Sequence, residues 1–100
     1  MFPKRRRIRD RKALARYHAA QPRCEVCGQK AMAEPHHLVP RSQQGDDVAE
    51  NLLSLCWSHH IGPEGWHILG KHRWFKRFQF DLPRPVAERV ARVAGLALAD

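Results

Sequence analysis

Cysteine is scarce in this sequence, with three residues among 100. Because an odd number of cysteines cannot all pair within one chain, a disulfide framework is excluded as the main source of stability. A chain this short buries a smaller share of its surface than a typical domain does, and it is often stabilised by a metal ion or by disulfides. The sequence therefore favours a bound metal ion.

Long apolar runs are also missing, so no segment has the length and composition of a membrane-spanning helix. The first residues, Met1 to Arg7, lead into further charge rather than into the apolar core of a secretory signal peptide. Internal repeats and low-complexity tracts are absent as well. We therefore expect one small soluble domain that resides in the cytoplasm.

Acidic residues are few: 10 Asp and Glu stand against 18 Lys and Arg, which gives a formal charge of +8 and a pI near 10.3. Each lysine or arginine set against a phosphate releases condensed counterions, so this excess favours a polyanionic partner. Nucleic acid is the first expectation and an anionic membrane the second. The alternative is that the positive charge only keeps the protein soluble. The basic residues cluster at 4–12 and 71–77, however, and such clustering favours a binding surface.

The first half of the sequence predicts little regular structure. The basic start is expected to be a mobile arm that leads into a helix from about Asp10, its N-cap, to Ala20. Two short extended segments, 33–39 and 51–55, flank a loop at 42–47 that is rich in turn-forming residues.

The last third of the sequence is mostly helical. Helix is expected to resume near Trp66 or after Gly70, followed by a linker at 81–85 and a last helix over 86–99. The apolar stripe of that last helix should pack on the domain, with dimerisation as the alternative. The stripe consists of Val86, Val90, Val93 and Ala97.

The three cysteines and one histidine have the spacing of zinc ligands. Cys24 and Cys27 form one pair across a tight turn that ends at Gly28, and Cys56 and His59 form a second pair with the same gap. A structural zinc ion takes four such nitrogen or sulfur ligands. The alternative is a redox pair at Cys24 and Cys27, but redox pairs usually begin a helix that follows a strand, and no such setting is visible here.

The residues left over carry a second pattern: a histidine doublet at His36-His37, Asn51, His60 and His67. This order, within PHHLVPRSQQGDDVAENLLSLCWSHH at 35–60, resembles the HNH nuclease family. It resembles in particular the small, often phage-associated members of the family. These members have CxxCG before the doublet. After the doublet they have a histidine and a glycine spaced as in HILG of this sequence, followed by an aromatic residue, which is Phe75 in this sequence. The resemblance covers about residues 22–78.

The resemblance implies an α+β fold, a small zinc-stapled ββα-metal finger of treble-clef-like form with flanking N- and C-terminal helices. We expect a basic arm and helix at 1–21 and the nuclease domain at 22–80. Residues 81–100 should form a linker and a C-terminal helix that packs on the domain. The protein is expected to be a monomer or a weak dimer.

The histidine doublet should divide two roles, because adjacent strand residues point to opposite faces. By resemblance, His36 binds a catalytic metal ion and His37 is the general base, with His60 as a second ligand of the ion. A neutral imidazole suits both roles, since an unperturbed pKa of about 6.5 leaves it mostly unprotonated at neutral pH.

The third ligand of the catalytic ion is less evident. Family members commonly have a histidine four residues after the position of His60, where this sequence has Glu64. The HILG signature indicates a three-residue insertion, so we favour His67 over Glu64. The implied cofactors are a structural Zn²⁺ and a catalytic divalent ion, which could be Mg²⁺, Mn²⁺, Ni²⁺ or Zn²⁺.

Asn51 matches the family asparagine, which belongs to the catalytic motif and often holds the loop between the two strands. An ordinary turn residue or helix N-cap is the alternative. Arg41 lies close enough to the doublet to reach the scissile phosphate, or else is a solvated charge. Other contacts to the DNA backbone are expected from Lys71, Arg73, Lys76 and Arg77. Trp74 lies between them, and a tryptophan at such a position more often belongs to the apolar core than provides a surface on which a base stacks.

The sequence thus predicts a metal-dependent HNH endonuclease that nicks or cleaves DNA and leaves a 5′ phosphate. A non-catalytic, zinc-stapled DNA-binding or adaptor module is the alternative, as is a nuclease specific for branched recombination intermediates. His37 and His60 argue for catalysis, because a binding module needs neither a base nor a further ligand. The type of family member it resembles suggests the nucleoid of a bacterial host, with a phage terminase or a recombination protein as partner.

Overall fold

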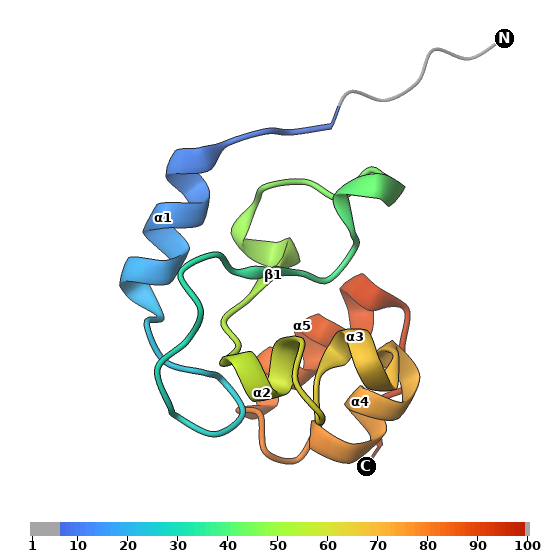
Figure 1. The fold of residues 1–100 in the computed structure, drawn as a ribbon. Helices are drawn as coiled ribbons and strands as arrows, with labels where there is room; N and C mark the ends of the chain where they lie inside the picture. The colour runs from blue at the N-terminus through green and yellow to red at the C-terminus, as the bar shows by residue number, and fades with distance from the viewer. Residues whose placement is uncertain (1–6, 100) are drawn as a thin grey trace, which may run out of the picture.

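The middle of the chain forms a short hairpin followed by helices, in a computed structural model that describes residues 7–99 (Figure 1). β1 (His36–His37) pairs antiparallel with β2 (Leu52–Leu53), so that His36 lies opposite Leu53. α2 (Trp57–His60) follows β2 after three residues, and α3 (Trp66–Leu69) and α4 (Lys71–Phe78) come next. This order of two strands and a helix confirms the expected α+β finger.

α1 (Arg11–Ala20) lies beside the hairpin, on the left of Figure 1. Its N-cap is Asp10, whose side chain accepts a hydrogen bond of 3.1 Å from the Ala13 amide. Two residues of the expected mobile arm, Ile8 and Asp10, are instead hydrogen-bonded to the loop around Asp47. Residues 1–6 of the arm lie outside the described part of the chain.

The apolar core lies between the hairpin, α4 and the last helix. Trp74 is fully buried and Phe75 nearly so, and both belong to one cluster with Leu53 and Leu55. The Trp74 indole donates a hydrogen bond of 3.0 Å to the carbonyl of His59. Trp74 is therefore a core residue, and it fixes the position of α2.

α5 (Arg84–Ala94) begins two residues earlier and ends five residues sooner than the sequence predicted. Its end has a clear cause, because Gly95 adopts a left-handed conformation with φ of 70°, a common helix terminator. The buried face also differs from the predicted stripe, since Ala97 lies beyond the helix and is exposed. The buried side chains of α5 are Ala87, Val90, Ala91 and Ala94.

A polar network joins the two outer helices to the finger. Tyr17 donates a hydrogen bond of 2.7 Å to the Glu25 carboxylate, which also accepts one from the Ser54 amide. Arg89 of α5 donates to the Tyr17 hydroxyl and to the carbonyl of Leu52. Burial and the Glu25 carboxylate raise the pKa of Tyr17, so its hydroxyl stays protonated as a donor. Among the described residues, no helix is long and apolar enough to span a membrane.

Candidate functional site

The first of two side-chain clusters consists of Cys24, Cys27, Cys56 and His59, whose ligand atoms all lie within 4.8 Å of one another. The Cys56 sulfur lies 3.2 Å from Nδ1 of His59 and 3.7 Å from the Cys27 sulfur. Three sulfurs and one imidazole nitrogen at this spacing suit a tetrahedral zinc ion. The cluster is therefore compatible with the zinc staple of the predicted finger.

Local backbone structure brings the cysteine pair together. Gly28 has φ of 80°, a left-handed value that favours glycine, and its amide closes the turn onto the carbonyl of Cys24. Burial alone would raise the pKa of the Cys24 thiol, but backbone hydrogen bonds, from Cys56 first, outweigh it and lower the pKa. Burial raises the pKa of the Cys27 thiol to about 11. Metal binding at neutral pH must therefore displace the Cys27 proton.

Glu64 lies against this cluster and not in the second one. Its carboxylate lies 3.6 Å from Nε2 of His59 and accepts a hydrogen bond of 2.6 Å from Arg77. A histidine that binds metal through one nitrogen usually donates from the other to a carboxylate or carbonyl. Glu64 therefore lies against the first cluster, whereas His67 lies with His36 and His60 in the second, and Arg77 is engaged in an ion pair with Glu64.

We expect Glu64→Gln to weaken zinc binding roughly 10-fold to 100-fold, the usual effect of losing an outer carboxylate. The amide keeps the shape of the side chain but loses the charge that orients His59. Competition with a chromogenic zinc chelator would measure the change. Glu88→Gln, which removes an exposed carboxylate paired with Arg84, is the matched control and should bind zinc as wild type does. Equal zinc affinity in both variants would contradict the assignment.

The second cluster consists of His36, His60 and His67, whose ring nitrogens also lie within 4.8 Å of one another. Nε2 of His60 lies 3.2 Å from Nε2 of His67, while Nδ1 of His60 faces the sulfur of Met32. His36 is 4 % exposed, and its buried Nε2 has no hydrogen-bond partner in the described part of the chain. A buried nitrogen without a partner is costly unless an ion or water engages it, so the cluster fits a metal ion.

Two of these rings, His36 and His60, also favour the neutral state that metal binding requires. Burial lowers the pKa of His36 well below its usual value, and neighbouring His60 and His67 lower it further. Burial and then His67 lower the pKa of His60. Neutral imidazoles keep the lone pairs through which histidine binds metals.

This cluster opens onto a cleft of about 370 Å³. His37 of β1 and Arg41 of the loop between the strands line the same cleft. The remaining walls are mainly apolar and consist of Met32, Pro35, Pro40 and Trp66, with Glu34 at the edge. The cleft therefore brings a fourth histidine and a cation beside the three-histidine cluster.

His37 is held by Asp47, a residue that the sequence analysis missed. The Asp47 carboxylate lies 2.7 Å from Nε2 of His37 and 3.4 Å from Nε of Arg41, and it is 2 % exposed. Burial alone would raise the pKa of Asp47, but the hydrogen bonds with His37 and the Asp10 amide outweigh it and lower the pKa. Asp47 is therefore an ionised partner of His37. In the sequence it stood out only as a turn-forming residue of the 42–47 loop.

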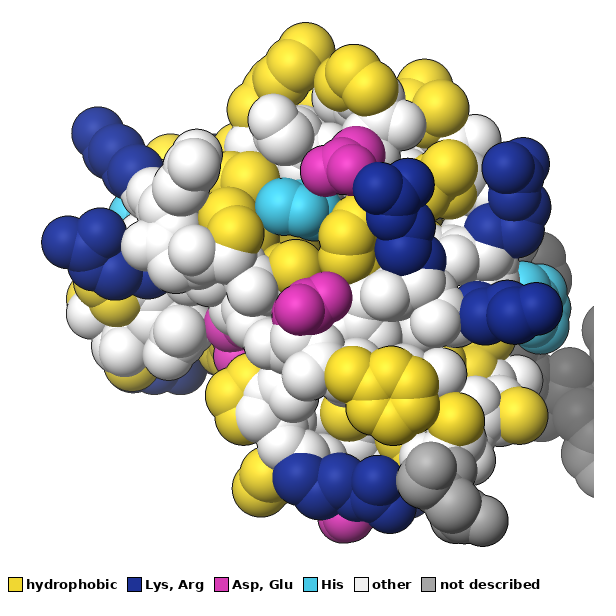
Figure 2. Space-filling model, turned by 90° about the horizontal axis from the view of Figure 1, so that it is seen from below, with side chains coloured by type: hydrophobic (Ala, Val, Ile, Leu, Met, Phe, Trp, Pro, Cys, Tyr) yellow, Lys and Arg dark blue, Asp and Glu magenta, His cyan; other side chains and the backbone are white. Residues whose placement is uncertain are grey.

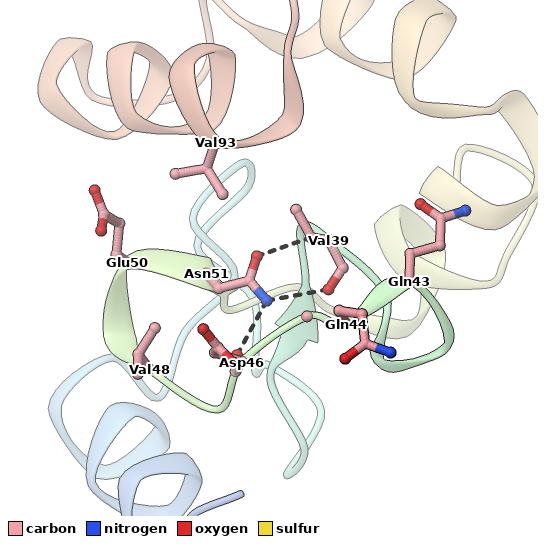
Figure 3. A pocket seen from close by; sticks show the side chains of 9 residues that line it. Val39, Gln43, Gln44, Asp46, Val48, Glu50, Asn51 and Val93 are labelled. Carbon is pink, nitrogen blue, oxygen red and sulfur yellow. Dashed lines mark hydrogen bonds between the residues drawn. The ribbon is translucent and has the colours of Figure 1, made fainter. Parts of the chain in front are cut away.

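Asn51 holds the loop that carries Asp47 (Figure 3). Its side chain accepts a hydrogen bond from the amide of Val39 and donates to the carbonyls of Val39 and Asp46, at 2.8, 3.1 and 3.0 Å. Asn51 ends the short 3-10 helix Ala49–Asn51, so it is not an N-cap, and it does not line the cleft. These contacts assign it a positioning role.

The basic residues of α4 differ in their contacts. Lys71 donates to the carbonyl of Ala94 and Arg77 pairs with Glu64. Arg73 and Lys76 are exposed, and within residues 7–99 neither side chain makes a hydrogen bond or an ion pair. On the face in Figure 2, Lys and Arg side chains lie apart from one another around an area of hydrophobic, acidic and histidine side chains.

Comparison with known proteins gives one match. Residues 24–62 match the family model described as HNH endonuclease. No curated protein and no solved structure matched the chain. The matched range contains both zinc-ligand pairs, the histidine doublet, Asn51 and His60, but not His67. At residues 24–62 the chain thus matches the HNH endonuclease family, and this match supports a function of the nuclease type.

Proposed function

We propose that this protein is a metal-dependent endonuclease that hydrolyses DNA phosphodiester bonds, with His37 as the general base. The observation that carries the proposal is that His37 opens onto the same cleft as His36, His60 and His67. These three histidines would hold one catalytic ion, which when bound would offset negative charge on the phosphate and on the departing 3′ oxygen.

The contact with Asp47 decides which atom of His37 acts as the base. An ionised carboxylate beside Nε2 keeps the proton on that nitrogen, so that the lone pair lies on Nδ1. Nδ1 would take a proton from the attacking water, and Asp47 would stabilise the imidazolium that results. Asn51 supports this arrangement because it fixes the loop on which Asp47 lies.

DNA is the proposed substrate, bound mainly through its phosphates. Arg41 lines the cleft beside His37, and Arg73 and Lys76 on α4 are exposed and carry charges that phosphate oxygens could pair with. Lys71 and Arg77 have partners within the protein and do not line the cleft, so we rank them below Arg41, which pairs with Asp47 but lines the cleft. Such contacts give affinity without sequence preference, and the site favours no single target. A phage terminase or a recombination protein in a bacterial cell remains the proposed partner.

The test is nicking of supercoiled plasmid in Mn²⁺ or Mg²⁺ by wild type, His67→Ala and His72→Ala. Loss of a ligand should remove several kcal/mol of charge stabilisation, so His67→Ala should nick at least ~100-fold more slowly. His72 is an exposed histidine outside the cleft, so its variant should match wild type. A chelator should stop all nicking.

Two results would contradict the proposal. If wild type bound DNA but nicked it with none of the four candidate ions, the protein would be a DNA-binding or adaptor module. If His67→Ala nicked as fast as His72→Ala, the third ligand would be wrong. A four-way DNA junction assayed in parallel tests the remaining alternative, because a nuclease for branched intermediates should cut the junction and leave the plasmid intact.

A further inference from the structure

We propose that the segment Ile8–Asp10, which precedes α1 and lies outside the matched domain, positions the general base through Asp47. This inference rests on the proposed function of His37. It gives the basic start of the chain a second role, because the segment would support the catalytic geometry and not only attract DNA.

The segment is hydrogen-bonded to the loop through one backbone pair and two aspartate carboxylates. The amide of Ile8 donates to the Asp46 carboxylate at 2.8 Å, and the amide of Asp47 donates to the carbonyl of Ile8 at 2.9 Å. The amide of Asp10 then donates to Oδ2 of Asp47 at 3.0 Å. Just before them, the Arg7 guanidinium donates to the carbonyl of Arg41. These bonds tie the segment to the residues that flank His37.

The two oxygens of the Asp47 carboxylate have different partners. Oδ1 faces Nε2 of His37 and, at 3.4 Å, Nε of Arg41, whereas Oδ2 accepts the Asp10 amide. Because both oxygens are engaged, the plane of the carboxylate is set by the position of the Asp10 amide. The orientation of the His37 ring should follow that plane, since a carboxylate accepts a hydrogen bond best near the plane of its oxygens.

The Asp10 amide is itself fixed by α1. The side chain of Asp10 caps the helix through the Ala13 amide, and α1 is tied to the finger through Tyr17 and Glu25. A line of hydrogen bonds therefore runs from the first turn of α1 through Asp10 and Asp47 to the base. Small displacements of a catalytic group are costly, with ~1 Å reducing a rate by about 100-fold.

An ester in place of one peptide bond tests this line without changing any side chain. A synthetic segment 1–23 with the α-hydroxy acid analogue of Asp at position 10 can be ligated to residues 24–100 through Cys24, which begins the second segment. This product lacks only the N–H that Asp47 accepts. The comparison variant carries the ester at position 9, where the Arg9 amide makes no hydrogen bond among residues 7–99. It weakens the Ile8 carbonyl as acceptor of the Asp47 amide but leaves the N–H that binds the Asp47 carboxylate in place.

We expect the ester at position 10 to lower kcat for plasmid nicking about 10-fold, with KM changed by less than about twofold, whereas the ester at position 9 should lower kcat much less, because it leaves both partners of the Asp47 carboxylate oxygens intact. Asp47→Asn is the second variant and should lose at least ~100-fold in kcat. An amide cannot accept from both His37 and the Asp10 amide, so it either leaves two N–H groups facing each other or stabilises the wrong tautomer of His37.

Nitrogen-15 NMR of the His37 ring gives a readout that does not need nuclease activity. In wild type and in the comparison variant, the signals should show the proton on Nε2, and the ester at position 10 should shift them toward a mixture of tautomers. Identical ring signals and equal kcat in the two esters would overturn the proposal, as would a change in KM alone. An inactive wild type would refute the nuclease function, while the ring signals would still decide whether the segment orients His37.

Discussion

His59→Ala should lose tightly bound zinc and unfold, whereas His60→Ala should keep zinc and remain folded but fail to nick DNA. The two residues are neighbours on α2, yet Nδ1 of His59 lies 3.2 Å from the Cys56 sulfur, while Nε2 of His60 lies 3.2 Å from that of His67. Structural zinc contributes ~10–16 kcal/mol in zinc-finger peptides, and a whole domain of this size is stable by only about 5–15 kcal/mol. Loss of one zinc ligand should therefore be enough to unfold the chain.

Zinc content after dialysis and far-ultraviolet circular dichroism measure the two outcomes. Each variant serves as the control for the other, because both replace a histidine of the same helical turn. If both variants unfolded, or if His60→Ala lost zinc while His59→Ala kept it, the division of the doublet between two sites would be wrong.

His37→Ala should lower kcat for nicking by ~10²–10⁴-fold, the usual contribution of a general base. The variant should still bind DNA, because His37 is not one of the proposed phosphate contacts. Removal of the ring leaves the buried Asp47 carboxylate with fewer partners, so we also expect a loss of about 1–3 kcal/mol in folding stability. Single-turnover nicking and thermal unfolding would measure the two effects separately.

Rescue with free imidazole separates lost chemistry from lost structure. Added imidazole can enter the space left by His37 and should restore part of the nicking rate, whereas His67→Ala should respond less because it lacks a ligand. His72→Ala is again the control for the assay. Undiminished nicking by His37→Ala would refute its role as the base.

Local spacing made part of this molecule predictable. The zinc ligands form two pairs, each across one turn. The positions of Cys24 and Cys27 relative to each other therefore depend on only three peptide units. The alternation of side chains along a strand similarly predicts that His36 and His37 face different ways. The strands themselves proved much shorter than expected, two residues each, because the loop between them is held by Asn51 rather than by further strand pairing.

Contacts between distant segments were not predictable in this way. Asp47 reaches His37 only because the backbone returns tightly at Gly45, where an added Cβ would lie 1.7 Å from the carbonyl of Val39. Glu64 was considered as a ligand of the catalytic ion because it is close to His60 in sequence. The turn from Gly62 to Gly65 instead directs its carboxylate to His59.

The end of the last helix was missed for a different reason. A glycine at position 95 is a typical helix terminator, but apolar residues continue beyond it, and their spacing suggested a longer helix. The buried face of α5 consists of three alanines and Val90, while Val86 and Val93 are half-buried. The spacing of apolar residues along a helix does not by itself show which of them are fully buried and which lie half-buried at the edges of the buried face.

The single turn of α2 has a thermodynamic consequence for metal loading. His59 and His60 share one peptide bond, so the ordering of either side chain restricts the backbone of the other. If the proposed function is correct, zinc in the first cluster raises the affinity of the second for its ion. Linked equilibria are reciprocal, so the ion in the cleft must then strengthen zinc binding by the same factor. In that case the protein saturated with its catalytic metal ion would lose zinc to a chelator more slowly than the protein without the catalytic ion.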